Sequence, residues 1–238
     1  MRKVLVVWAV SVMVVSGIAN AGSIGINMGA DRASLDPTDI AGVAAQGNWN
    51  NGSGGVGSAS GLMDDAGAIT SAGAAWTNHD PGGSVWGDTW QVPGRGAGSA
   101  DDKLMTAYID PIWGDCVSEI TLSDIPYAQY DAYVYFGTDN EGGIGYVTDG
   151  ATTYSYTIDV SAPFTTFIQT LATDNSAPVA NYAVFSGLTG SSLTLITGTT
   201  DVAQVGGMMG IQIVEVPEPM TLSLLALGGM GLIRRRRA

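Results

Sequence analysis

Apolar and polar residues alternate with a period of two through the second half of the chain. In residues 152–159, Tyr154, Tyr156 and Ile158 alternate with polar residues. Successive side chains of a β-strand point to opposite faces, so this pattern predicts a strand with one buried face. Six further segments are expected to be strands, because they alternate in the same way or are rich in β-branched and aromatic residues: residues 24–28, 118–122, 131–136, 182–185, 193–197 and 209–214.

Short glycine-bearing turns separate these segments, and no long amphipathic helix lies between them. Parallel βαβ units need such a helix, so the pattern favours antiparallel pairing. The sequence therefore predicts an all-β fold for residues 22–215, an antiparallel two-sheet β-sandwich of jelly-roll-like form. Residues 22–98 are rich in Gly, Ala, Ser and Asn, which predicts loops with short ordered pieces and a short helical turn at residues 62–68.

The first 21 residues have the pattern of a secretory signal. Arg2 and Lys3 precede an apolar stretch over residues 4–15, and Ala19 and Ala21 fit the small-x-small cleavage rule. We therefore expect export and cleavage by signal peptidase after Ala21. The alternative is an amino-terminal membrane anchor, which the short apolar core disfavours.

The last 23 residues, 216–238, form a third segment. Pro217-Glu218-Pro219 precedes an apolar run over residues 220–233, and Arg234, Arg235, Arg236 and Arg237 follow it. Flanking arginines stay on the cytoplasmic side, which places everything before Val216 outside. A helix over the apolar run would span about 21 Å of a hydrocarbon core about 30 Å thick, so this short hydrophobic helix is a marginal anchor.

This arrangement resembles the PEP-CTERM sorting signal of bacterial surface and exopolysaccharide-associated proteins. The resemblance implies an exosortase partner that cuts near Pro217, Glu218 and Pro219 after transient anchoring in the inner membrane. It also implies that the upstream domain reaches the outer surface or extracellular matrix. Met220 departs from the pattern, since a small hydroxyl residue is common there. Such tails also carry an ice-binding C-terminal name, but the threonine pairs of this chain form no repeat. The alternative is a plain tail anchor.

Charge excludes one class of function. Without the two terminal segments, only Arg32, Arg95 and Lys103 remain against all 22 acidic residues, a formal net charge of −19 for residues 22–219. Three cations cannot assemble a phosphate-neutralising patch, so nucleic acid is excluded as a partner. Cys116 is the only cysteine, so no intrachain disulfide can form, and we expect it to be a small buried apolar residue.

The residue pattern of three predicted strand segments carries a second, looser resemblance. Residues 130–136, 184–188 and 210–213 resemble the galactose-binding-like sandwiches that precede such tails in environmental bacteria. The resemblance implies a sandwich fold that often serves in carbohydrate binding.

Few residues of the chain suit catalysis. His79 is the only histidine, and its context, Asn78-His79-Asp80-Pro81-Gly82, predicts a solvated side chain in a turn. A glycosidase needs two acids at a set separation, and the four glutamates show no such pairing. We therefore expect no catalytic residues and no enzymatic activity.

Oxygen-rich loops suggest calcium as a candidate cofactor, although no cofactor is firmly indicated. Asp139, Asn140 and Glu141 follow directly from a predicted strand, and oxygen ligands suit a hard cation. Asp64-Asp65 and Asp101-Asp102 are further options. The alternative is that these are solvated turn acids.

Tryptophans supply the candidate sugar contact. Trp86 and Trp90 flank a short Gly-Asp-Thr segment, where an indole face beside an acid would stack a sugar ring. The alternative is that the tryptophans fill the core or cover a sheet edge. Three functions follow: a non-catalytic surface or matrix protein, a carbohydrate-binding module that calcium assists, or a secreted glycan hydrolase.

Overall fold

The computed structural model describes residues 21–85, 87–111, 115–174, 176–200 and 206–217. These contain one short helix and thirteen strands: β1 (Ser23–Asn27), β2 (Asn50–Asn51), β3 (Val56–Ser60), β4 (Gly73–His79), β5 (Asp88–Gln91), α1 (Ala100–Leu104), β6 (Ala107–Asp110), β7 (Val117–Ser123), β8 (Tyr130–Phe136), β9 (Ile144–Thr148), β10 (Thr153–Thr157), β11 (Tyr182–Leu188), β12 (Leu193–Thr199) and β13 (Met208–Glu215). The predicted C-terminal helix over residues 220–233 lies outside the described residues.

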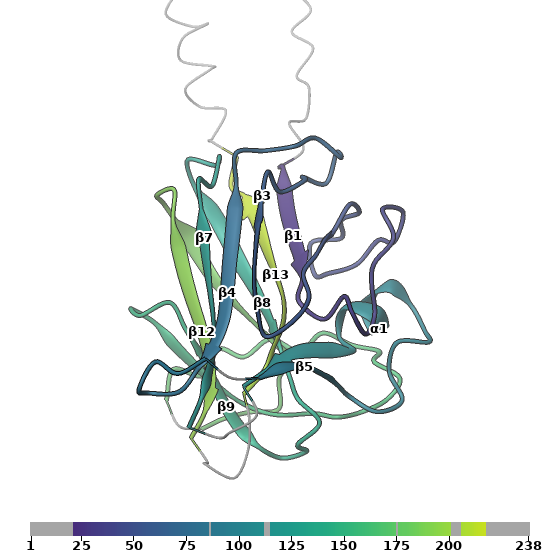
Figure 1. The fold of residues 1–238 in the computed structure, drawn as a ribbon, viewed down its shortest axis with the longest axis vertical. Coiled ribbons are helices and arrows are strands. Elements are labelled where there is room, and N and C mark those ends of the chain that lie inside the picture. Colours follow the sequence, from purple (N-terminus) through teal and green to yellow (C-terminus); the bar gives the residue numbers. More distant parts are fainter. Residues whose placement is uncertain (1–20, 86, 112–114, 175, 201–205, 218–238) are drawn as a thin grey trace, which may run out of the picture.

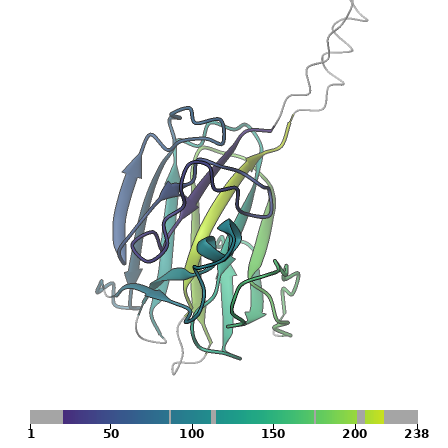
Figure 2. The same ribbon diagram turned by 90° about the vertical axis from the view of Figure 1, so that its right-hand side faces the viewer.

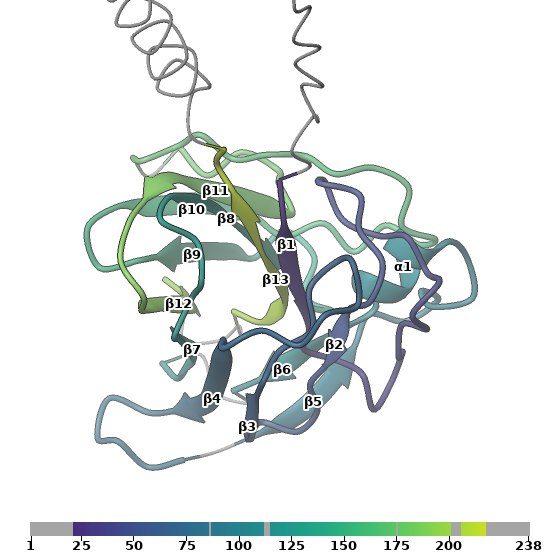
Figure 3. The ribbon, with the colours of Figure 1, turned by 90° about the horizontal axis from the view of Figure 1, so that it is seen from above.

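Two sheets form a sandwich, which confirms the predicted fold class (Figure 1). The seven-stranded sheet has the order β11-β8-β13-β1-β2, with β6 beside β13 and β5 beside β6. The six-stranded sheet has the order β10-β9-β12-β7-β4-β3. All strand pairs are antiparallel except β1 with β2. Seen from above, the two layers face one another (Figure 3).

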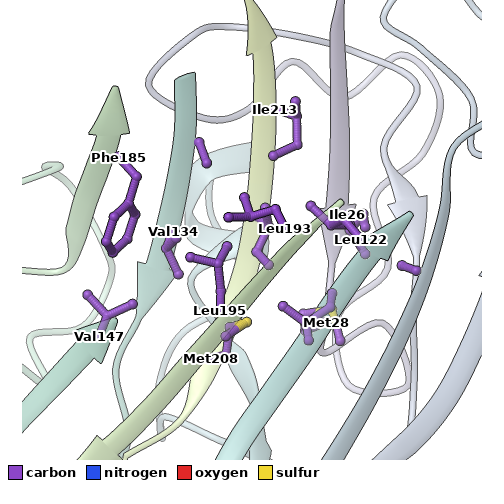
Figure 4. Packing of buried hydrophobic residues seen from close by; sticks show 14 of the residues in the cluster. Ile26, Met28, Leu122, Val134, Val147, Phe185, Leu193, Leu195, Met208 and Ile213 are labelled. Carbon is purple, nitrogen blue, oxygen red and sulfur yellow. The ribbon is translucent and has the colours of Figure 1, made fainter. Parts of the chain in front are cut away.

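An inner core fills the space between the sheets. Val134 of β8 and Ile213 of β13 face Leu195 of β12 and Leu122 of β7 across this space (Figure 4). The alternation in residues 118–122 and 131–136 places Leu122 and Val134 correctly, because both side chains belong to the inner core. In β7 the burial alternates residue by residue, and Ile120 is completely buried.

An outer core lies on the opposite face of the seven-stranded sheet. Tyr135 of β8 and Met209 of β13 pack there against Leu104 of α1, Trp49 and Phe164. Helix α1 and irregular segments of the chain cover this face (Figure 2). The sheet is therefore buried on both faces, which explains why six consecutive residues at the start of β13 are buried.

Buried polar side chains hold the covering segments in place. Asp102 of α1 is 1 % exposed. Its Oδ2 accepts from the backbone N–H groups of Gly96 at 2.7 Å and Gly98 at 2.9 Å, and its Oδ1 accepts from Phe164 at 2.7 Å. Ser99 caps the helix by accepting from the N–H of Asp102 at 3.2 Å. One carboxylate thus joins two loops that cover the outer core.

A second buried group joins the outer covering to the sheet. Gln212 of β13 accepts from the Tyr135 hydroxyl at 2.9 Å and donates to the side-chain oxygen of Gln46 at 2.7 Å. The Tyr135 hydroxyl accepts in turn from the N–H of Val43 at 2.8 Å. These bonds satisfy polar groups that would otherwise be buried without partners.

Two expectations about the first part of the chain are wrong. Residues 62–68 form no helical turn: Leu62 donates to Ala72 at 2.9 Å, and Met63 bridges Ile69. The Asp64 carboxylate accepts from the N–H of Ala68, an arrangement that competes with helical backbone bonds. Residues 22–98 also contain β3, β4 and β5, and β4 is an internal strand of the six-stranded sheet. Its Gly, Ala and Trp residues lack the β-branched signal on which the prediction depended.

Candidate ligand-binding site around Trp90

Trp90 presents an indole at the surface of the sandwich. It lies in β5, where it pairs with Tyr108 of β6. Strand β5 is at the edge of its sheet and pairs only with β6 among the described strands. Trp90 is 47 % exposed, whereas its strand partner Tyr108 is buried.

Asp139 fixes the indole in one orientation. The Trp90 Nε1–H donates to Asp139 Oδ2 at 3.1 Å, and the buried Tyr108 hydroxyl donates to Asp139 Oδ1 at 2.8 Å. Burial, together with this hydrogen bond, raises the pKa of Tyr108, so the hydroxyl stays protonated and donates. The structure therefore brings together two sequence candidates, Trp90 and Asp139, that are far apart along the chain.

Arg32 completes the site, and sequence reasoning missed it. Its guanidinium lies over the Trp90 ring, 5.7 Å from the ring centroid. It also donates to the Thr89 carbonyl at 3.2 Å and lies 3.9 Å from the Asp31 carboxylate. A signal for it exists in the sequence, because Arg32 is one of three basic residues in a strongly acidic segment.

This arrangement suits a neutral, hydroxyl-rich ligand. One hydrogen bond and the Arg32 contact hold the indole, so binding would cost little side-chain entropy. Arg32 lies over the ring, and 47 % of the residue remains exposed for contact with a ligand. The Asp139 carboxylate accepts hydrogen bonds and the Arg32 guanidinium donates them, so hydroxyl groups of either polarity can be paired.

A groove of about 280 Å³ lies on the loop after β10. Asp159, Ser161, Phe164, Thr165, Thr166 and Ile168 line it. The turn that follows Asp139 is hydrogen-bonded to the segment just before the groove, because Gly142 donates to the Ile158 carbonyl at 3.1 Å. Arg95 fixes the groove loop by donating to the carbonyls of Asp159 and Ser161 at 2.9 Å each.

The predicted calcium site at Asp139, Asn140 and Glu141 stays a prediction. Glu141 is exposed, and both Asp139 oxygens already accept one hydrogen bond. Over the part of the chain that the structure describes, no three acidic, His or Cys side chains form a group that could hold a metal ion.

The further calcium options have structural partners. Asp65 accepts from the N–H of Ser23, and Asp101 accepts from the N–H of Gly42. Burial raises the pKa of Asp101. These carboxylates, like Asp102, satisfy backbone N–H groups.

His79 does not lie in a turn as predicted. It is the last residue of β4 and pairs with Val117 of β7. Its Nε2 lies 3.3 Å from Glu119 Oε2, and its Nδ1 lies 3.1 Å from the Asp80 carbonyl oxygen. The sequence pattern predicts no strand at residues 73–79, but β7 supplies a full partner for β4, and His79 is half-buried at its end.

The other tryptophans separate by environment. Trp49 and Trp76 are 5 % and 6 % exposed and belong to the outer and inner cores. Trp86, the second candidate for sugar stacking, lies outside the described residues. Cys116 is buried, as expected of a small apolar side chain.

Helix α1, the one helix among the described residues, is too short to cross a bilayer. The apolar run over residues 220–233 is not among the residues described.

Comparison with known proteins gives one match to a family model. The PEP-CTERM protein-sorting motif matches residues 215–237. No curated protein matches the chain. Among solved structures, a ruminal GH26 endo-β-1,4-mannanase is similar with 12 % sequence identity and a TM-score of 0.26, over 57 % of this chain and 27 % of the mannanase chain. The sorting-motif match confirms the signal predicted from Pro217, Glu218, Pro219 and the arginine block, and it identifies the chain as an exported protein that an exosortase sorts to the cell envelope or surface.

Proposed function

We propose that this is a non-catalytic surface or matrix protein whose sandwich binds polysaccharide through the Trp90 site. In this proposal signal peptidase removes residues 1–21, the tail anchors the chain transiently in the inner membrane, and residues 22–215 form the working domain. The exposed, hydrogen-bonded indole of Trp90 is the observation that carries the proposal. Exopolysaccharide is the ligand class that agrees with the sorting signal.

The chemistry of the Trp90 site supports a sugar ligand. A pyranose ring offers an apolar C–H face that stacks on an aromatic ring, and hydroxyl groups around its edge. Asp139 and Arg32 lie at the indole to accept and donate hydrogen bonds. The groove beside Ser161, Thr165 and Thr166 offers further hydroxyl groups to a second sugar of the same chain.

Calcium would strengthen binding through the turn that contains Asp139. Each Asp139 oxygen retains a lone pair after its one hydrogen bond, and Asn140 and Glu141 follow directly. A cation held there would take its remaining ligands from water and sugar hydroxyls. We therefore propose that calcium assists, and binding should be measured in calcium and in a chelator.

The structural role of Asp102, the most buried carboxylate among the described residues, supports a non-catalytic function. The oxygens of Asp102 accept from three backbone N–H groups, which assigns that side chain to folding. A glycosidase would need two acids with different proton affinities beside the bound sugar. Asp139 is held by the two side chains that build the Trp90 site, and its role there is to orient the indole.

The binding site is tested in two steps. A glycan-array screen first identifies a polysaccharide that the protein captures, and the affinity for it is then measured for the Trp90→Ala variant. We expect Trp90→Ala to weaken binding of the captured polysaccharide about tenfold, which corresponds to about 1.4 kcal/mol. Leu171→Ala is the matched control, because Leu171 is a large apolar side chain that is 73 % exposed. Equal affinity of the Trp90→Ala variant and the parent protein would contradict the proposed site.

Intact mass of the protein from its own cells tests the processing. A chain that begins at Gly22 and lacks the residues after Pro219 is the expected product. A mass that retains Arg234, Arg235, Arg236 and Arg237 would show an uncut anchor, and the matrix role would then have to be abandoned.

A further inference from the structure

The two ends of the sandwich domain meet at one place. Strands β1 and β13 are neighbours, and Ser23 pairs with Val214. Beyond this pair, the Glu215 N–H donates to the Gly22 carbonyl at 2.9 Å, and the Gly22 N–H donates to Glu215 Oε2 at 3.2 Å. The start of β1 and the end of β13 therefore lie at the same end of the molecule (Figure 1).

Gly22 immediately precedes β1 and is closely packed. A Cβ atom at this position would lie 3.0 Å from the Tyr127 hydroxyl oxygen and 3.2 Å from its ring. Gly22 thus packs against the Tyr127 side chain, and its backbone nitrogen is held by the Glu215 carboxylate.

Acidic groups surround this nitrogen. Asp65 accepts from the N–H of the next residue, Ser23, at 3.1 Å, and Glu215 accepts from Gly22 itself. Burial raises the pKa of Tyr127, and the charges of Asp64, Asp65 and Glu215 raise it further. The surroundings therefore favour a positive charge at Gly22.

The three basic residues of the domain make their contacts at other places. Arg32 lies beside Asp31, and Lys103 contacts Asp39 at 2.7 Å. Arg95 donates to the carbonyl of Ser161. A cation for the acidic groups at Gly22 must come from elsewhere.

We propose that cleavage after Ala21 supplies this cation: the new α-ammonium group of Gly22 pairs with Glu215 and locks β1 to the end of β13. Hydrolysis adds water across the Ala21–Gly22 amide, leaves the carboxylate on Ala21, and frees an amine on Gly22 that takes up a proton. An ammonium group then donates to Glu215 in place of a neutral amide, and charge-assisted bonds are roughly twice as strong as neutral ones. This inference rests on the signal cleavage proposed above.

The pair links the two processing signals of the chain. Glu215 is the first residue of the matched sorting motif, and Pro217 follows two residues later. The N–H of the intervening Val216 donates to the Gln129 carbonyl at 2.9 Å, so the base of the motif is already tied to the domain. Signal cleavage would therefore complete the anchoring of the segment that the exosortase recognises.

Thermal unfolding of two chains in detergent tests the ion pair. One chain consists of residues 22–238 with a free amino group, and the other carries Asn20 and Ala21 in front. We expect the free chain to melt about 2 °C higher, as a charge-assisted bond in a domain of this size should give. Glu215→Gln should remove the difference, whereas Glu119→Gln, a matched change on β7, should leave it intact.

The same pair predicts a dependence on pH. Glu215, with Asp64 and Asp65 nearby, should raise the amino-group pKa above its ordinary range of about 7.7–8.0. A raised pKa stabilises the fold below the unfolded value, and this benefit is lost as pH rises through the folded value. The melting difference should therefore be full at about pH 6.5 and absent at about pH 10.5.

Two outcomes would overturn the inference. Equal melting of the two chains at about pH 6.5 would show that no ion pair forms. A melting difference that persists in the Glu215→Gln variant would show that another interaction causes it. A native amino terminus other than Gly22 would instead overturn the proposed cleavage, which the intact mass detects separately.

Discussion

The inner and outer cores are built from different kinds of chain. The inner core lies between two regular sheets, whose backbone groups are paired along the strands. The outer core lies between one sheet and a covering of loops and a five-residue helix. Loops leave backbone N–H groups unpaired, so buried side chains must accept from them.

This difference explains where the polar residues are buried. Asp102, Gln212 and the Tyr135 hydroxyl all serve the covering of the outer core. The inner core contains the tyrosine Tyr156, whose side chain also carries a hydroxyl group. Its ring stacks on Phe136, with ring centroids 3.7 Å apart. Among the described residues that hydroxyl has no hydrogen-bond partner. The Tyr156 hydroxyl is thus buried without a partner, whereas the buried polar groups of the outer covering are paired.

The largest effect is expected from Asp102→Ala. The change removes the acceptor of the Gly96, Gly98 and Phe164 N–H groups, and the bond to Phe164 is fully buried. We expect a loss of about 4 kcal/mol in the free energy of unfolding, measured by urea denaturation. Glu141→Ala, an exposed acid, is the control and should change the free energy by less than about 0.5 kcal/mol. A similar small loss for both variants would contradict the role given to Asp102.

A matched pair of Tyr→Phe variants compares the two cores directly. Tyr135→Phe removes a donor to Gln212 and an acceptor for Val43, so it should cost about 1–2 kcal/mol. Tyr156→Phe removes a hydroxyl without a partner, so it should be neutral or stabilising by up to about 1 kcal/mol. Both are measured by urea denaturation, and a larger loss for Tyr156→Phe would reverse the comparison.

The smallest effect concerns the ion pair at the edge of the outer covering. The hydrogen bond from Lys103 lowers the pKa of Asp39, so the pair stabilises the fold above the ordinary aspartate value of about 3.9. That contribution is lost as pH falls through the lowered pKa. We expect amide exchange of residues 35–49 to accelerate slightly, relative to β7, on acidification below about pH 4. Asp39→Asn should show the faster exchange already at neutral pH, and an unchanged ratio would argue against the pair.

The sequence predicted the inner core better than the outer core. Ala132, Val134 and Phe136 alternate with tyrosines in β8, and all three belong to the inner core. Tyr135, on the opposite face of the strand, is completely buried by the loop covering. Alternation reports which face of a strand is apolar, and it carries no information about loops that return from distant parts of the chain.

The candidate site shows the same limit. The sequence suggests Trp90 for sugar stacking and Asp139 for calcium as separate candidates, and a hydrogen bond joins them in the structure. Arg32 could not be placed from sequence, because its position over Trp90 depends on how residues 28–49 cross the sheet. Contacts between segments this far apart are set by strand order, which local patterns do not encode.

By itself, the sequence determined the all-β class, the main strands of the second half and the sorting signal. These features depend on period-two alternation and on a contiguous motif, both of which are local. The tertiary structure alone decided that one sheet is buried on both faces, that Trp90, Asp139 and Arg32 share a site, and that Gly22 meets Glu215. Each of these depends on backbone pairing and packing between residues remote in sequence, where burial and hydrogen-bond satisfaction are settled by the whole fold.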